Sequence, residues 1–215
     1  MKKIILFTII LISSFSNAQS DKEVYSKNTK FVYGAEGMEP KDFTVDIKGK
    51  NKEDLLSKAK EWLNEKYKNL ETKNGKTDKT VGIDTIYEIE ETNKDGGADE
   101  AGKGKNNIKL RFKGYTSNAI CFGEKPDYGC EDVEYVIELR FKDGEYRFKP
   151  VKLTYKAASN KKKQKIELDK NKFYSSDGKI VNGYGKVPSQ IETLFNGLNK
   201  SILNYLTNKK QEDEW

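Results

Sequence analysis

The sequence predicts an α+β domain in which two helices cover one face of an antiparallel sheet. Three observations predict this class. Four segments between residues 83 and 155 alternate apolar and polar residues, as strands with one buried face do. Apolar residues recur at helical spacing before and after these segments. The turn signal Asp143-Gly144 joins the last two segments as a hairpin. The expected element order is therefore β-α-β-β-β-β-α, with the later strands in a meander.

The first elements follow a lead-in over residues 19–40, which carries an edge strand near residues 30–33 and then Gly34, Gly37 and Pro40. The core domain is expected at residues 41–155. Residues 43–47 alternate as its first strand, and Asn51 with Asp54 predicts the capped start of a helix. That helix has an apolar face built by Leu55, Leu56, Ala59, Trp62, Leu63 and Tyr67.

The predicted meander runs through residues 83–89, 108–112, 133–141 and 146–155. Its alternation slips near Pro150, which predicts a bulge. Residues 156–187 form a Lys-rich excursion that we expect to be solvated or a loose hairpin around Asp177-Gly178. The closing amphipathic helix, residues 188–208, is expected to begin with a capping box, and residues 209–215 to be a frayed tail. The residues that predict this helix start are Pro188, Ser189 and Glu192.

Composition excludes several classes of function. The chain has 215 residues, enough for one sizeable core, and 34% of them are charged. It contains no histidine. Ser-His-Asp and Cys-His catalysis, His-ligated zinc and a near-neutral histidine proton shuttle are therefore excluded.

The first 18 residues are predicted to be a cleavable signal peptide. Lys2 and Lys3 precede a short apolar run, and Ser16-Asn17-Ala18 gives small residues before a cleavage expected after Ala18. The alternative is a buried amino-terminal strand. About nine apolar residues are too few for a bilayer that needs roughly 20, and no other run approaches a membrane span. We expect an exported protein of a Gram-negative envelope, periplasmic or extracellular, with no lipid anchor and no transmembrane segment.

Export predicts that Cys121 and Cys130 form a disulfide, because an oxidising compartment favours the pairing of an even number of thiols. The two cysteines flank a turn-rich loop that is able to bring them together. A redox pair is the functional alternative, although the spacing is not C-x-x-C.

Three motif groups resemble those of a known family. They are the stretch from Lys48 to Leu63, with its glycine-led turn and its Ala-x-x-Trp-Leu segment, the connection Gly102-Lys103-Gly104, and the closing amphipathic helix. Their order and spacing resemble an exported bacterial family of unknown function that has a TBP-like fold. The likeness covers about residues 40–155, with a weaker echo at 188–207, and the cysteine loop and Lys-rich insert depart from it. It implies a TBP-like fold and export. The family has no established activity or catalytic residues.

Three further motifs are interpreted as structural. Residues 97–103 match the phosphate-loop pattern except for its final hydroxyl, but a strand follows them where a helix is needed. A calcium loop near Asp169, Asn171 and Asp177 fails at Phe173. No cofactor and no metal is therefore expected. The polar face of the predicted sheet has four acidic residues that could supply a catalytic carboxylate pair: Glu88, Glu90, Glu134 and Glu138. Cross-strand charge pairing explains these acidic residues better. The basic partners are Lys109, Arg111, Lys113 and Arg140.

Nucleic acid is not expected as a partner, because acidic residues interleave with basic ones on the polar face and an exported chain meets no genome. We expect a non-enzymatic binding or structural module whose partner is an unknown envelope protein or polymer. Its candidate contact residues are the aromatic side chains of Tyr115, Phe122 and Tyr128.

Two alternatives remain. One is a histidine-independent hydrolase that uses a carboxylate pair. The other is docking to an anionic surface through the excursion, which holds nine lysines against three acidic residues. The lysines expected to dock are Lys161, Lys162, Lys163 and Lys165.

Overall fold

The computed structural model describes residues 30–68, 81–91, 107–123, 129–156, 162–170 and 172–208. Its helices are α1 (Lys52–Lys68) and α2 (Val187–Leu206). Its strands are β1 (Val32–Gly34), β2 (Gly37–Glu39), β3 (Phe43–Asp46), β4 (Val81–Glu91), β5 (Asn107–Phe122), β6 (Gly129–Lys142), β7 (Glu145–Lys156) and β8 (Lys163–Ile166). The predicted signal peptide and its cleavage site, the phosphate-loop-like segment and the predicted tail lie outside the described residues.

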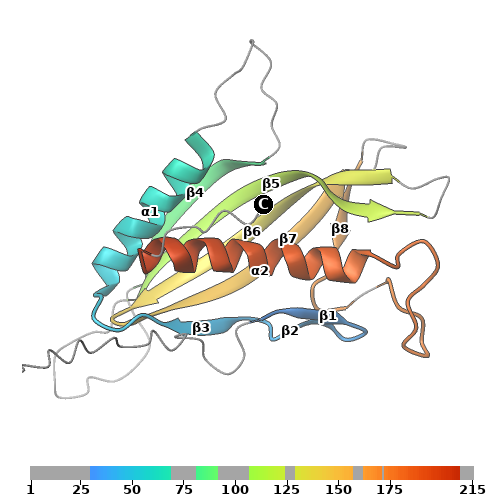
Figure 1. Ribbon diagram of the computed structural model, residues 1–215, viewed down its shortest axis with the longest axis horizontal. Coiled ribbons are helices and arrows are strands. Elements are labelled where there is room, and N and C mark those ends of the chain that lie inside the picture. Colours follow the sequence, from blue (N-terminus) through green and yellow to red (C-terminus); the bar gives the residue numbers. More distant parts are fainter. Residues whose placement is uncertain are drawn as a thin grey trace, which may run out of the picture.

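The main sheet has six strands in the order β3-β7-β6-β5-β4, and β8 also pairs with β7. Every pairing in it is antiparallel, and β4 to β7 are neighbours in chain order, so the predicted meander is confirmed. β3 pairs with the first half of β7 and β8 with the second half. Both helices lie on one face of this sheet (Figure 1). The predicted α+β class is confirmed.

Local sequence signals act where they were expected. The Asn51 Oδ1 atom accepts a hydrogen bond of 2.7 Å from the backbone N–H of Asp54, which caps α1. Asp143 and Gly144 turn β6 into β7, and Gly144 has a φ of 78° that suits glycine. The β6–β7 register shifts between Val136 and Ile137, next to Pro150, as the predicted bulge requires.

The core lies between the sheet and the helices. On α1, the Trp62 ring packs edge-on against Phe112 of β5, with ring centroids 5.9 Å apart, and its Nε1 atom donates a hydrogen bond of 3.1 Å to Ser201 of α2. On α2, buried Asn199 accepts a hydrogen bond of 2.8 Å from the hydroxyl of Tyr146 on β7. These contacts join each helix to one face of the sheet. The other face of the sheet is not covered by α1 or α2, and strand pairing fixes which residues lie next to each other on it.

The lead-in contains a strand close to the predicted position, β1, but this strand is not part of the main sheet. β1 pairs only with β2 in a separate two-stranded sheet. The N–H of Phe31 donates to Asn196 Oδ1 at 2.8 Å, and that of Tyr33 donates to Glu192 Oε1 at 2.9 Å. Side chains of α2 therefore take the backbone donors that a neighbouring strand would have taken.

The capping box predicted for α2 from Ser189 and Glu192 is not formed. The cap residue is Lys186, whose side chain makes no capping hydrogen bond, and the helix begins at Val187. The carboxylate of Glu192 accepts the N–H of Tyr33 instead, while the Ser189 hydroxyl donates to the carbonyl of Lys186. A tertiary contact has taken the acceptor that the local motif needs.

The excursion is more ordered than the predicted solvated segment. Part of it forms β8, and three apolar side chains between the start of β8 and the start of α2 are buried in the core: Ile166, Leu168 and Phe173. The N–H of Met38 donates to the carbonyl of Leu168 at 2.8 Å. Gly37 allows this approach, because a Cβ there would lie 2.5 Å from that carbonyl oxygen. The expected hairpin around Asp177-Gly178 is present and is closed by a bridge between Tyr174 and Ile180.

Candidate functional site

The candidate site lies on the face of the main sheet that is turned away from α1 and α2, which we call the open face. Residues directly opposite each other on antiparallel strands point to the same face. Leu139 on β6 pairs with Phe148 on β7, and both are buried under the helices. The next pair along these strands, Arg140 with Arg147, therefore lies on the open face.

Basic side chains outnumber acidic ones on the open face. The register of β3 and of β5 to β8 assigns eleven described basic residues and, together with Asp42 just before β3, six described acidic residues to it. The basic residues are Lys109, Arg111, Lys113, Arg140, Lys142, Arg147, Lys149, Lys152, Lys156, Lys163 and Lys165. The acidic residues are Asp42, Asp46, Asp132, Glu134, Glu138 and Glu145. Side chains of β4 lie outside this description.

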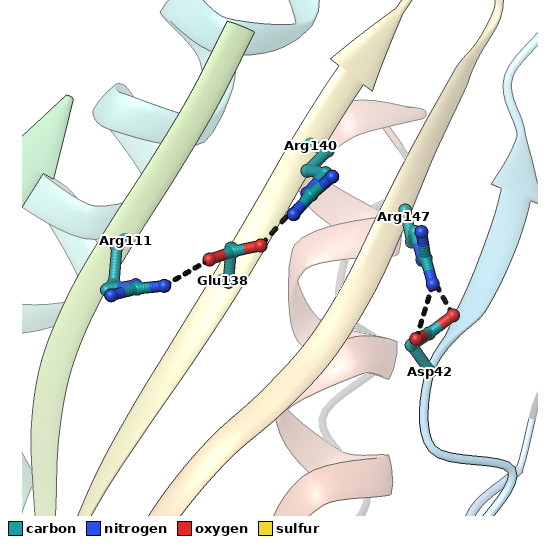
Figure 2. Close-up of polar contacts among 5 residues, drawn as sticks. All are labelled: Asp42, Arg111, Glu138, Arg140 and Arg147. Atoms are coloured by element: carbon teal, nitrogen blue, oxygen red, sulfur yellow. Dashed lines mark hydrogen bonds and ion pairs between the residues drawn. The ribbon is translucent and has the colours of Figure 1, made fainter. Parts of the chain in front are cut away.

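Glu138 is at the centre of this face, and only 4% of its side chain is exposed. Its carboxylate accepts hydrogen bonds from Arg111 Nη2 and, at 2.9 Å, from Arg140 Nε (Figure 2). Burial alone would raise the pKa of this carboxyl group, but the two guanidinium donors and the nearby charge of Lys109 outweigh it and lower the pKa. The group is therefore held as an anion between cations.

A second carboxylate, Glu134, is also held by two cations. Lys113 Nζ lies 3.3 Å and Lys163 Nζ 2.6 Å from its oxygens. Burial raises the pKa of Glu134, and hydrogen bonds from Lys163 and Lys113 lower it further than burial raises it. The charge pairing predicted from the sequence is confirmed for Glu134 and Glu138, whereas the side chains of Glu88 and Glu90 lie outside the described residues.

Arg147 forms the other strong ion pair of the open face. Its Nε and Nη2 atoms each donate a hydrogen bond of 2.6 Å to one carboxylate oxygen of Asp42 (Figure 2). This two-point contact raises the pKa of the guanidinium group, with the hydrogen bond as the largest cause. Beside the pair is a pocket of about 260 Å³. It is lined by Asp42, Thr44, Arg140, Lys142, Glu145 and Arg147.

The arginines are the residues that sequence reasoning missed. The chain has only three arginines among its 40 basic residues, and all three lie on the open face. Arg111 and Arg140 were interpreted only as partners for acidic residues, and Arg147 was not singled out. Arginine presents a planar fork of donors that lysine lacks. The restriction of arginine to three adjacent strands was the signal that could have found them.

Two of the three predicted aromatic contact residues, Tyr115 and Phe122, are among the described residues, and both are partly buried. Phe122 packs against Tyr155, with ring centroids 4.8 Å apart, and edge-on against Tyr184 at 6.0 Å. Tyr115 is half-buried on β5, on the open face, and pairs with Glu134. Tyr128 lies outside the described residues.

The predicted docking lysines belong to two environments. Lys163 and Lys165 extend from β8 onto the open face, where Lys163 binds Glu134, and Lys165 Nζ lies 2.7 Å from Glu167. Lys162 is exposed just before β8, and Lys161 lies outside the described residues. Lys163 and Lys165 therefore form one surface with the lysines of β5 to β7.

The predicted disulfide between Cys121 and Cys130 is present in the structure. The two residues are direct partners on β5 and β6. The N–H of Cys121 donates to Gln190 Oε1 of α2 at 2.9 Å, and the N–H of Gly123 donates to the carbonyl of Gly183 at 2.8 Å. The bridge thus fixes the ends of β5 and β6 next to the start of α2, a structural position.

In the described part of the chain, no group of three or more Cys, Asp or Glu residues is arranged to hold a metal ion. Neither helix of that part is both long enough and apolar enough to cross a membrane.

The fold and the site together define an α+β domain whose sheet has one face under two helices and one basic face. No protein-family model and no curated protein matches the chain. Among solved structures, a DUF4468 family protein from Bacteroides ovatus has a TM-score of 0.49 at 15% identity, covering 85% of this chain and 90% of that one. A TBP-like protein from Parabacteroides distasonis has a TM-score of 0.39 at 14% identity, covering 88% and 97% respectively.

Both descriptions agree with the resemblance stated from the sequence, a family of unknown function and a TBP-like fold. Their identities are below 25% and their TM-scores below 0.5. Neither neighbour therefore transfers a site, a ligand or an activity to this chain.

Proposed function

We propose that this protein is an exported, non-enzymatic module that binds an anionic polysaccharide of the cell envelope on its open face. The observation that carries the proposal is the ratio of eleven basic to six acidic side chains among the described residues of this face. Such a surface attracts polyanions over about a Debye length, roughly 8 Å at physiological salt. Export is the sequence prediction from residues 1–18.

The arrangement of the cations favours a polymer with repeated charges. Alternate residues of one strand are roughly 6.6 Å apart, and neighbouring strands are roughly 4.8 Å apart. Lys149 and Lys152 extend the row of basic residues along β7 on either side of the bulge. A flexible polyanion is able to place successive charged groups on such a grid, whereas a small anion occupies one point of it.

A polysaccharide is favoured over a lipid surface by the lack of an apolar patch. Among the described residues, the exposed large hydrophobic side chains are Val32, Val151 and Ile180. Peripheral membrane binding by insertion needs a contiguous apolar face. These three residues come from three different segments, β1, β7 and the hairpin bridge, and supply no such face.

The hydrolase alternative has less support. A glycosidase of the usual kind needs one carboxylic acid with a raised pKa as its proton donor. The two described carboxyl groups named for that role, Glu134 and Glu138, both have a lowered pKa. Each is also enclosed by two cations, which leaves it poorly suited to donate a proton near neutral pH.

Salt elution from an immobilised polymer tests the proposal. The protein is applied to dextran sulfate, polygalacturonate and neutral dextran, and the NaCl concentration that elutes it is measured. One variant carries Lys149→Gln and Lys152→Gln on the open face. The matched control carries Lys186→Gln and Lys200→Gln at exposed positions of the α2 side, so both variants lose two positive charges.

We expect retention on at least one anionic polymer but not on neutral dextran, and elution of the open-face variant at lower salt than the control. Equal shifts for both double variants would reduce the effect to net charge and refute the assignment to this face. Retention on anionic lipid vesicles with none on either anionic polymer would refute the choice of polysaccharide.

A further inference from the structure

The inner part of the open face has a row of hydrogen-bond donors that crosses four strands. Lys109 on β5 is directly opposite Arg140 on β6, Arg140 is opposite Arg147 on β7, and Arg147 is opposite Thr44 on β3. Neighbouring strands lie roughly 4.8 Å apart. Three cationic side chains followed by a hydroxyl thus stand side by side across the sheet.

Such a row is unfavourable in the absence of anions, because like charges directly opposite each other on a sheet destabilise it. Two internal carboxylates offset part of this cost. Glu138 accepts from Arg140, and Asp42 accepts from Arg147. In the group formed by Lys109 and the three arginines, four positive charges meet these two negative ones. The local excess of positive charge remains.

The pocket of about 260 Å³ opens at the Arg140–Arg147–Thr44 end of this row. Lys142 and Glu145, which also line it, are paired at 3.1 Å and contribute no net charge. The volume is below the range of roughly 300 to 1,000 Å³ typical of drug-sized ligands. It therefore leaves room for a tetrahedral oxyanion group but is small for a drug-sized ligand.

We infer that this pocket binds one sulfate or phosphate ester group of the anionic polysaccharide, through Arg140, Arg147 and Thr44. The inference rests on the proposed function and names the chemical class of its ligand. A tetrahedral ester group presents three peripheral oxygens, and donors on three adjacent strands are arranged to meet them. A carboxylate presents only two, in one plane. Arginine forks are the side chains best matched to oxyanions of this kind.

Asp42 acts in this site as an internal competitor for Arg147. It occupies two of the five N–H donors of the guanidinium group at 2.6 Å each. An incoming ester group shares or displaces this contact. The two interpretations of the Arg147–Asp42 pair, as a purely structural contact and as part of a binding site, therefore make different predictions for Asp42→Asn. Loss of the carboxylate strengthens anion binding if Arg147 is a ligand-binding residue, and does not strengthen it if the pair is only structural.

The test is a titration of the mature protein with sodium sulfate, sodium phosphate and sodium acetate, with NaCl added to keep ionic strength constant. Binding is followed by the ¹H–¹⁵N chemical shifts of the backbone amides of Thr44, Arg140 and Arg147. We expect saturable shifts at these amides with sulfate or phosphate and weaker, non-saturating ones with acetate. The response to each of the two oxyanions distinguishes a sulfate from a phosphate ester as the natural group.

Three variants identify the donors. Arg147→Lys keeps the charge but loses the fork, and it should raise the dissociation constant by about tenfold. Asp42→Asn should lower that constant. Lys200→Gln, on α2, is the control and should leave it unchanged. The chemical-shift spectra themselves report whether each variant is folded, and thermal unfolding of Arg147→Lys separates a loss of stability from a loss of binding.

Equal responses to acetate and sulfate, shifts spread over the face without saturation, or an Asp42→Asn variant that does not bind more tightly would each overturn the inference. The proposed function fails separately. If the polymer is retained on the open face while free sulfate and phosphate do not bind the pocket, the module stands and this site is wrong. If the ions bind but no polymer is retained, the site stands and the polysaccharide role is wrong.

Discussion

Replacing Glu138 with glutamine should destabilise the protein more than any other single charge removal on the open face. Its side chain is 4% exposed, and both arginine partners are more than a third exposed. Glutamine keeps one oxygen acceptor and loses one charge-assisted hydrogen bond, worth roughly 1.5 to 3 kcal/mol. The cations around it also lose their central anion. Because the arginines are partly solvated, the cost should fall below the roughly 3 to 5 kcal/mol of a fully buried pair.

We therefore expect Glu138→Gln to lower the free energy of unfolding by about 2 kcal/mol at pH 7. For a chain of this length, that loss corresponds to a fall of about 4 to 8 °C in the melting temperature. Urea unfolding followed by circular dichroism measures the first quantity and calorimetry the second. The control is Glu145→Gln on the same face. Its pair with Lys142 is partly exposed and should contribute less than about 1 kcal/mol.

The pH dependence gives a second readout of the same variant. The pKa of Glu138 is lowered in the folded protein from its ordinary value of 4.5, because the arginine hydrogen bonds outweigh burial. A lowered folded pKa contributes stability that is fully present above the unfolded value and is lost as the pH falls through the folded value. The wild-type protein loses this contribution in acid and the variant does not. The stability difference between them should shrink below pH 4.5.

A Glu138→Gln protein as stable as the wild type from pH 6 to 8 would refute this reasoning. So would a stability difference that stays constant as the pH is lowered from 6 to 3, because the effect would then not come from the charge of the carboxylate.

Three further predictions concern the framework that holds the open face. Replacing Cys121 and Cys130 together with serine should cost about 2 to 3 kcal/mol in urea unfolding, since the bridge closes a loop with a sequence separation of 9; an unchanged midpoint would contradict this. Gly114→Ala should destabilise the protein by about 1 to 3 kcal/mol, because the added Cβ would lie 2.5 Å from the buried ring of Tyr135. A melting temperature equal to that of the wild type would show that the ring is able to move. Tyr146→Phe should lower the free energy of unfolding by about 1 to 3 kcal/mol, because the buried side-chain oxygen of Asn199 loses the hydroxyl that donates to it at 2.8 Å. Calorimetry of the variant measures this loss. An unchanged stability would mean that another group replaces the hydroxyl.

The meander could be predicted from the sequence because its signals are local. Alternation along a strand, a two-residue turn at Asp143-Gly144 and a proline at position 150 each act within a few residues. The Asn51 cap also depends only on a residue three positions away. Such local features form the same structure independently of distant parts of the chain.

Contacts between residues that are far apart in the chain could not be predicted from the sequence. The lead-in is held by Asn196 and Glu192, more than 150 residues away. The same contact removed Glu192 from the expected capping box. In the excursion, Ile166 and Phe173 are buried apolar residues within a Lys-rich composition. Ile166 is opposite Leu153 of β7, and the Phe173 ring centroid lies 6.2 Å from that of Tyr33 in the lead-in. Composition averages over a segment and hides the few side chains that join it to the core.

The candidate site shows the same limit for charge. Counting along the chain assigned the positive charge to residues 156–187, whereas strand register brings Lys163 and Lys165 together with cations from β5, β6 and β7 on one face. Sequence separation between these residues is large, and only the pairing of strands makes them neighbours. The basic excursion is therefore the outer margin of a larger surface. The three arginines of the open face lie on the adjacent strands β5, β6 and β7. At these arginines, the geometry of the hydrogen-bond donors, and not their charge alone, should determine which anion binds.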